Sequence, residues 1–391
     1  MTGRIYFDNG ATTSVDPRVI EEMTPYFSEI YGNASSLHSF GREAKEALSN
    51  SRSRLAASIN ADSSELIFTS GGTESNNLAI KGVAYANRAK GRHIVVSAIE
   101  HDCVMNSCRW LESEGFAVTY LPVDGEGVVD CKALEEAIRK DTVLVSVMHA
   151  NNEIGTMEPI DEISEICQQH GVYFHTDACQ SFGKVPTQTT EKGVDLMTIN
   201  SHKIYGPKGV GCLFVRDGVK VSAWQHGGGH EFGLRSSTEN IAGIVGFAKA
   251  AELCRCEMDE ESGRIQRLRD KLIKGVMENV GSAYLNGHRD FRLPNNANFG
   301  FHGYEGEAIR ILLELDELGI AVSTGSACSS NQERNTPSHV LLAIGRNPVE
   351  ARGALRVTLG RYNTEEEVDY FVECLPRIVK SLRSISSVVG R

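Results

Sequence analysis

The stretch from residue 142 to residue 178, TVLVSVMHANNEIGTMEPIDEISEICQQHGVYFHTDA, contains the hydrophobic patterns that decide the fold. Residues 142–150 are nearly all apolar, which predicts a strand that is buried on both faces. Residues 160–171 have helical spacing and end in glycine, a common residue just past a helix C-terminus. Residues 172–178 predict a second buried strand. A strand, a helix and another strand in this order are typical of a parallel sheet covered by helices.

The same alternation continues on both sides of this stretch. It predicts further strands at 93–99, 117–123, 195–200 and 211–216, and helices at about 104–114 and 131–140. Beyond about residue 258 the sequence pattern changes. It predicts a long charged helix over 260–280, then shorter strands and helical stretches at 306–318 and 364–383. We therefore expect an α/β protein with a mostly parallel sheet and helices on both faces. The large α/β domain is expected over 14–257, and a smaller α+β domain over 1–13 and 258–391.

Composition excludes several classes of function. The chain has 391 residues, of which 41% are hydrophobic and 23% charged, with a net charge of -11. No long basic run is present, so we expect no nucleic-acid partner. The longest apolar runs have the length of strands, so we expect no membrane span and a cytoplasmic location. The ten cysteines are scattered and lack the spacing of a disulfide framework or a zinc site, so no metal is expected.

Polar clusters follow five of the predicted strands. They contain Thr73 in FTSGGTESNN (68–77), His101 in SAIEHDC (97–103), Asn152 in MHANNEIG (148–155), Asp177 in FHTDACQS (174–181) and Lys203 in TINSHKIYGPKGVGC (198–212). Each cluster alone has an ordinary structural explanation, such as a helix cap, a turn or a surface side chain. Because ligands of open α/β sheets bind at the carboxyl ends of strands, five such clusters at one edge predict a shared pocket.

The residue types in this pocket fit pyridoxal 5'-phosphate (PLP). The small residues before Thr73 would leave helix N-terminal amides free for a phosphate. Asp177 could hold a protonated ring nitrogen, and His101 could cover the ring. Lys203 stands at the end of a buried strand, where an amine is costly unless it is paired or used chemically. We therefore hypothesise that Lys203 holds PLP as a Schiff base and that Asp177 keeps the ring an electron sink.

Longer segments resemble a known family. They are IYFDNGATT (5–13), YGNASSLHSFG (31–41), SHKIYGPKG (201–209), HGGGHEFGLRSSTEN (226–240), STGSACSS (323–330) and LRVTLGRYNTEEEVDY (355–370), in addition to the clusters that contain Thr73, Asn152 and Asp177. Over nearly its whole length the chain resembles the cysteine desulfurases of the NifS/IscS type. These belong to the PLP-dependent transferases of fold type I, the aspartate aminotransferase-like enzymes.

The resemblance implies a role for each matching residue. The catalytic residues would be Lys203, Cys328 and His101. The phosphate would be held by Gly72, Thr73, Ser201 and His202, and by Thr238 of the neighbouring subunit of a homodimer. Asp177 would pair with the ring nitrogen, Gln180 and Asn152 would bond the ring hydroxyl region, and Asn152 would also lie near the substrate. Arg356 would bind the substrate carboxylate, for which a bidentate guanidinium is well suited.

The implied reaction converts L-cysteine to L-alanine and leaves the sulfur on Cys328 as a persulfide. The acceptor would be an iron–sulfur scaffold protein or another sulfur carrier. Cys328 stands in a Ser- and Gly-rich stretch, 323–338, whose length and composition suit a loop that moves between substrate and acceptor. The stretch after Cys328 is longer than is usual in the family, and Gly72 replaces the family's alanine or cysteine.

Two other classes of function remain at this point. A selenocysteine lyase or another PLP lyase would use the same pocket, because sulfur and selenium substrates differ little in size. An inactive homologue would serve as a scaffold or regulator. Cys328 favours sulfur transfer over the first alternative. The complete set of Lys203, Asp177, His101, Arg356 and Cys328 argues against the second.

Overall fold

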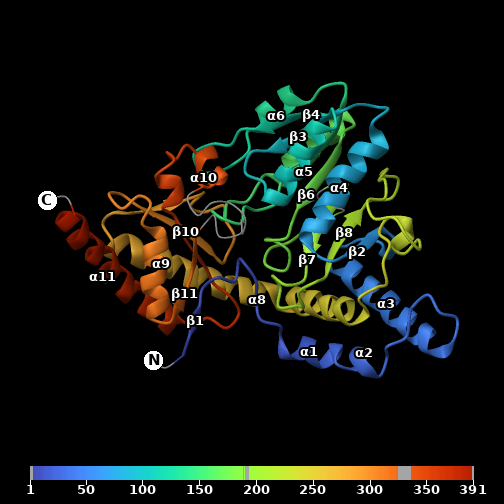
Figure 1. Ribbon diagram of the computed structural model, residues 1–391, viewed down its shortest axis with the longest axis horizontal. Helices are drawn as coiled ribbons and strands as arrows, with labels where there is room; N and C mark the ends of the chain where they lie inside the picture. The colour runs from blue at the N-terminus through green and yellow to red at the C-terminus, as the bar shows by residue number, and fades with distance from the viewer. Residues whose placement is uncertain (1–2, 188, 190–192, 325–335, 390–391) are drawn as a thin grey trace.

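The computed structural model describes residues 3–187, 189, 193–324 and 336–389, with side chains described up to residue 382. Its centre is a seven-stranded sheet in the order β2-β8-β7-β6-β5-β3-β4 (Figure 1). The strands are β2 (Leu66–Thr69), β3 (His93–Ser97), β4 (Ala117–Leu121), β5 (Thr142–Ser146), β6 (Tyr173–Asp177), β7 (Leu196–Asn200) and β8 (Gly211–Val215). All neighbouring pairs are parallel except those of β8, which is antiparallel to β2 and β7. The predicted mostly parallel sheet is confirmed.

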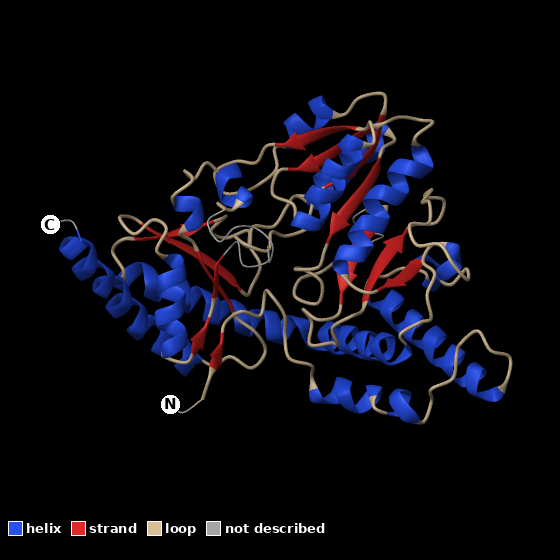
Figure 2. Ribbon diagram, in the orientation of Figure 1, coloured by secondary structure: helices blue, strands red, loops and turns tan. Residues whose placement is uncertain are grey.

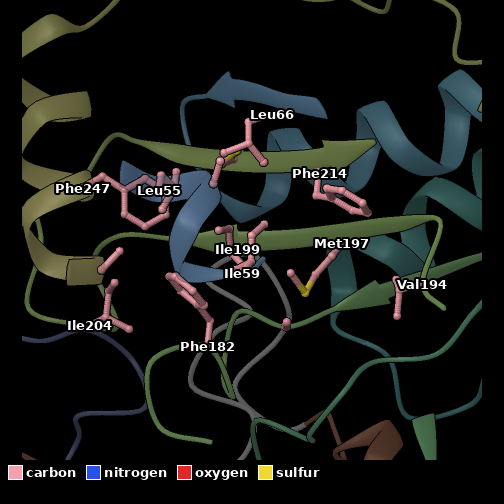
Figure 3. Close-up of a cluster of buried hydrophobic side chains, with 14 of the residues drawn as sticks. Leu55, Ile59, Leu66, Phe182, Val194, Met197, Ile199, Ile204, Phe214 and Phe247 are labelled. Atoms are coloured by element: carbon pink, nitrogen blue, oxygen red, sulfur yellow. The ribbon is translucent and has the colours of Figure 1, made fainter. Parts of the chain in front are cut away.

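Helices cover both faces of this sheet, as predicted (Figure 2). Along β3 the alternation of side chains sends Ile94 and Val96 to one face and Val95 to the other. The first face packs against α4 (Gly72–Asn87) and α5 (Asp102–Ser113). The second face packs against α3 (Ser39–Ser58), α6 (Cys131–Ala137), α7 (Ile160–His170) and the start of α8. In Figure 3 the labelled Leu55 of α3 and Phe247 of α8 lie beside each other, and they belong to the same cluster as the strand residues Met197 and Phe214.

The long connecting helix begins earlier than the sequence predicts. Helix α8 runs from Ile241 to Asn279, and the Asn240 side chain accepts a hydrogen bond from Gly243 N at its start. Its first turns carry small and apolar residues that are buried in the core of the large sheet. Its later turns bury Leu272 and Val276 in a second core. The predicted start at residue 260 was based on charged residues. These residues occupy only the part of the helix that lies beyond the first core.

The second core belongs to a smaller unit. An antiparallel sheet has the order β12-β13-β10-β9, and a parallel pair joins β1 to β11. The elements of this unit are β1 (Ile5–Tyr6), β9 (Ala283–Asn286), β10 (Asn296–Phe301), α9 (Ala308–Glu317), β11 (Ile320–Ala321), β12 (Ser323–Thr324), α10 (His339–Ala343), β13 (Leu355–Thr358) and α11 (Glu365–Val389). The N-terminal strand therefore packs with the C-terminal third. The division into domains at residue 257 stays a prediction, which these two cores support.

The remaining short elements lie outside the two sheets. They are α1 (Pro17–Met23), α2 (Pro25–Ser28) and the 3-10 turns η1 (Ser63–Glu65), η2 (Glu231–Gly233) and η3 (Glu350–Arg352). None of the described helices combines the length and apolar composition that a bilayer span needs. In the large sheet, β2, β3, β5, β6 and β7 run in the same direction, so their carboxyl ends meet at one edge. Strand β4 also runs this way but lies at the far side of the sheet, beyond β3.

Candidate active site

A cavity of about 170 Å³ lies at the carboxyl ends of these strands. Most of the residues predicted from the sequence line it: Gly72, Thr73, His101, Asn152, Asp177, Gln180, His202 and Lys203. They come from the segments that follow β2, β3, β5, β6 and β7. The predicted convergence of separate strand ends on one pocket is therefore present in the structure. The role of each residue within the pocket stays a prediction.

Asp177, the last residue of β6, is a buried but ionised carboxylate. It is 5% exposed. Its Oδ2 accepts a hydrogen bond from Asn76 Nδ2 at 2.6 Å, and its Oδ1 accepts one from Cys179 N at 2.9 Å. Burial acts to raise the pKa of Asp177, but the hydrogen bonds from Cys179 and Asn76 act in the opposite direction, and the pKa lies below its ordinary value. The Asp177 carboxylate thus carries a negative charge in the cavity and can bind a cationic group.

His101 is the N-cap of α5, where its side chain accepts a hydrogen bond from the backbone. Its Nδ1 accepts from Cys103 N at 3.2 Å and lies 3.1 Å from Cys103 Sγ. Burial, followed by the positive charge of Lys203, lowers the pKa of His101. The imidazole is therefore neutral at pH 7, and its Nδ1 is the unprotonated nitrogen.

Lys203 lies in the turn after β7 and is half-buried rather than fully buried. Its amine makes no hydrogen bond or ion pair with another residue in the described part of the chain. The neighbouring His202 is held by the N-terminal segment, because its backbone oxygen accepts from Thr13 Oγ1 at 2.9 Å. Burial and the adjacent Lys203 lower the pKa of His202 to about 4, so this imidazole is also neutral. A free amine thus shares one cavity with the carboxylate of Asp177.

The opposite wall of the cavity is the start of α4. Gly71 precedes this helix with φ 155° and ψ -179°, a conformation that essentially only glycine adopts. A side chain at Gly211 on the neighbouring β8 would meet the Gly71 backbone at 2.7 Å, so glycine is required there as well. Gly72 and Thr73, the first two residues of α4, line the cavity, and their amides have no acceptor within the helix. Free amides at a helix N-terminus bind phosphate.

Four predicted residues lie elsewhere. Ser201 is fully buried beside the cavity, and its Oγ has no hydrogen-bond partner among the described residues. Arg356 on β13 is 0% exposed and donates to Asn152 O and to Asp8 Oδ1, both at 3.0 Å, so it lies behind the cavity wall. Thr238 lines a separate hollow of about 80 Å³. Cys328 lies outside the described residues.

Sequence reasoning missed several residues that line the cavity: Gly10, Ala11, Asn76, Cys103, Cys179 and Asn200. Asn76 stands four residues after Gly72 on α4, so helical spacing could have placed both on the inner face. Cys179 stands two residues after Asp177, a position from which a backbone amide commonly caps a carboxylate. Gly10 and Ala11 carry no local signal, because their position depends on the path of the N-terminal segment.

The donors and acceptors in this cavity fit PLP. The ionised Asp177 suits a protonated pyridine nitrogen, and the free amine of Lys203 suits a covalent bond to an aldehyde. The open amides of α4 and the unpartnered hydroxyl of Ser201 suit a phosphate. The described part of the chain thus supplies a partner for each polar end of that cofactor.

Comparisons with known proteins agree with this geometry. The family model of the class-V aminotransferases matches residues 5–371. The "Cysteine desulfurase IscS" of Dictyoglomus turgidum is 52% identical over 387 residues, which cover 99% of this chain and 97% of that protein. A solved structure described as a NifS-like protein superimposes with a TM-score of 0.89 at 39% identity, covering 96% of this chain and 99% of the other. A structure described as SspA in complex with cysteine has a TM-score of 0.80 at 37% identity, covering 92% and 100%.

Proposed function

The chain belongs to the class-V aminotransferase family, as a PLP-dependent cysteine desulfurase of the NifS/IscS type, and we propose that Cys328 receives the sulfur. The observation that carries the catalytic part is the cavity in which Asp177, His101 and Lys203 meet the open amides of α4. The substrate is L-cysteine, which leaves as L-alanine. A cysteine molecule is bound in the related SspA structure, and the relatives' name states the same activity.

Asp177 and its partners would hold the cofactor ring. When bound, PLP supplies an electron sink that makes the α proton of the substrate removable. The carboxylate of Asp177 would accept a hydrogen bond from the protonated ring nitrogen. Asn76 Nδ2 and Cys179 N orient that carboxylate and keep it charged. Gly72, Thr73, Ser201 and His202 would bind the phosphate group, as the resemblance implies.

Lys203 and His101 would handle protons around the substrate. The amine of Lys203 is unpaired within the described residues, so it would be available to take the α proton of the substrate. His101 is neutral, because burial and Lys203 lower its pKa. A neutral imidazole can accept or donate a proton at pH 7. Gln180 is held by its hydrogen bond from Nε2 to Gly10 O at 2.9 Å, which orients its amide in the cavity wall.

Arg356 would bind the substrate carboxylate from behind Asn152. Its two terminal nitrogens donate to Asn152 O and Asp8 Oδ1, and its Nε has no partner within the described residues. Burial raises the pKa of Asp8, although the adjacent Arg356 acts to lower it. The Cys328 thiolate, the reactive form of cysteine, would attack the substrate sulfur. The sulfur–sulfur bond would form as the substrate carbon–sulfur bond breaks, and the electron pair left on the substrate carbon would take up a proton to give L-alanine.

A homodimer is part of this proposal. Thr238 lies outside the cavity of its own chain, as it would if it served the neighbouring subunit. The arm formed by α1, α2 and the start of α3 exposes large apolar side chains: Phe27 is 68%, Tyr31 65% and Leu37 92% exposed. Exposed apolar surface of this kind is typical of an interface. A cytoplasmic location and transfer to an iron–sulfur scaffold or another acceptor rest on the resemblance.

Sulfide release from L-cysteine in the presence of dithiothreitol tests the function. Wild-type protein should release sulfide and form alanine in equal amounts, while Lys203→Ala should lose both activity and the bound chromophore. Cys328→Ala should keep the chromophore and lose sulfide release. Cys256→Ala is the matched control, because Cys256 is an exposed cysteine on α8. Equal sulfide release by Cys328→Ala and wild type would contradict the role of Cys328. Retained selenide release from L-selenocysteine would then favour the lyase.

A further inference from the structure

Two cavity residues outside the predicted set connect Asp177 to His101. Asn76 Nδ2 carries two protons, and it has two acceptors: Asp177 Oδ2 at 2.6 Å and Cys103 Sγ at 3.1 Å. The Cys103 sulfur in turn lies 3.1 Å from His101 Nδ1. Asn76 is 1% exposed, so its hydrogen bonds are shielded from water. A continuous chain of contacts therefore runs from the carboxylate to the imidazole.

The direction of each hydrogen bond follows from the two groups that can only donate, the Cys103 backbone N–H and the Asn76 side-chain N–H. The Cys103 backbone N–H can only donate, and it donates to His101 Nδ1 at 3.2 Å. Nδ1 is therefore an acceptor, and the proton of the neutral ring must be on Nε2. The Asn76 amide can only donate to the Cys103 sulfur. The Cys103 S–H is then left to donate to Nδ1, whose lone pair it shares with the backbone N–H.

The charge state of the thiol agrees with this direction. Burial, followed by the charge of Asp177, raises the pKa of the Cys103 thiol to about 12. The proton therefore remains on sulfur at neutral pH. His101 Nε2 makes no hydrogen bond within the described residues, so it is the nitrogen available to a ligand in the cavity.

We propose that Cys103 is a positioning residue, which with Asn76 holds His101 in the tautomer that carries its proton on Nε2. This inference rests on the proposed function, because the tautomer of His101 matters for catalysis only if the cavity holds PLP and substrate. Cys103 and the backbone N–H at the start of α5 together define which nitrogen faces the chemistry. The side-chain amide of Asn76 donates one hydrogen bond to the Cys103 thiol and one to the Asp177 carboxylate, so it orients both groups.

The protonation of His101 also depends on charged groups from other elements. Lys203 after β7 and His339 on α10 disfavour the imidazolium, while Asp177 on β6 and Asp102 on α5 favour it. A hydrogen bond donated by Cys103 to the neutral ring acts in the same direction as Lys203 and His339: it stabilises the uncharged form and lowers the pKa of His101. Removing this donor should therefore raise the pKa of His101.

Nitrogen NMR of the full-length, PLP-containing protein tests the inference without using activity. Protein labelled with 15N-histidine separates protonated from unprotonated ring nitrogens, and comparison with His101→Gln identifies the His101 resonances. In the wild type, Nδ1 should be unprotonated and Nε2 protonated above the pKa of the ring. Cys103→Ala should raise the pKa of His101 by about half a unit to one unit, as expected for the loss of one hydrogen bond.

Two further variants separate the donor from simple packing. Cys103→Ser keeps a hydroxyl donor, so the pKa of His101 should stay close to its wild-type value. This variant still tests the inference if Cys103→Ala folds poorly. Cys108→Ala removes a buried thiol from the same helix but away from the cavity, and should leave His101 unchanged. The inference is overturned if wild-type Nδ1 carries the proton, or if Cys103→Ser and Cys103→Ala shift the pKa equally. It is also overturned if neither variant shifts the pKa. Sulfide release by the wild type separately decides the proposed function.

Discussion

The buried ion pair between Arg52 and Glu231 allows a direct test of how an uncompensated buried charge affects the free energy of unfolding. Arg52 lies on α3, and its guanidinium donates to both carboxylate oxygens of Glu231 at 2.7 and 2.6 Å. The two side chains are 11% and 2% exposed. Glu231 Oε2 also accepts from Phe68 N at 2.7 Å, which satisfies a backbone amide of the edge strand β2. The pair thus connects α3, the sheet edge and the segment that leads to Thr238.

Arg52→Met should lower the free energy of unfolding by about 3–5 kcal/mol, because it leaves the Glu231 carboxylate buried without a counter-charge. Adding Glu231→Gln should recover most of this loss. The neutral amide oxygen can still accept from Phe68 N, and no unpaired charge remains. The double variant is therefore expected to be more stable than Arg52→Met alone.

Urea unfolding followed by circular dichroism measures both effects. Arg54→Met is the matched control, because Arg54 lies on the same helix and its side chain, 33% exposed, pairs with Glu22 and Glu252 at the surface. This variant should cost about 1 kcal/mol or less, as is usual for exposed pairs. A double variant no more stable than Arg52→Met would refute the reasoning, since the penalty would then not come from the uncompensated charge.

Three further predictions concern the cavity and a second buried carboxyl group. Asp177→Asn should weaken PLP binding about 10- to 100-fold, which corresponds to one charge-assisted hydrogen bond, and fluorescence titration with PLP measures it. Arg356→Lys should raise KM for L-cysteine about 10-fold or more while the PLP spectrum stays unchanged, because an ammonium cannot reproduce the bidentate guanidinium. Burial raises the pKa of Glu158 to about 8 from 4.5, so the contribution of this carboxyl group to stability is full below pH 4.5 and is lost as the pH rises through 8. Glu158→Gln should remove about 1.4 kcal/mol per pH unit from that slope in urea unfolding, and an unchanged slope would contradict the assignment.

The large sheet could be predicted from the sequence because its strands are short apolar runs bounded by polar clusters. Parallel strands bury both faces, so β5 and β6 have no competing pattern. The predicted ends of β3 and β6 extend past the observed ends, because apolar residues continue into the loops that form the cavity wall. The start of α8 was misplaced because its first turns are apolar and pack in the core, whereas the charged pattern begins only where the helix leaves that core.

The site was predictable to the extent that it consists of residues that follow strands. Asp177 ends β6, His101 and Lys203 lie in the segments that follow β3 and β7, and the shared direction of the strands brings the three together. Asn76 and Cys103 were missed because they lie on helices, in the first two turns of α4 and α5. Their role depends on distances between α4 and α5, which no local pattern encodes.

The covalent attachment of PLP tests the central claim most directly. Borohydride reduction converts the bond between PLP and a lysine amine into a stable secondary amine, and mass spectrometry of the digested protein locates it. The account predicts that the modification lies on Lys203, in the peptide that also contains His202. Modification of another lysine, such as Lys184 in the neighbouring hollow, or no modified peptide at all, would contradict it.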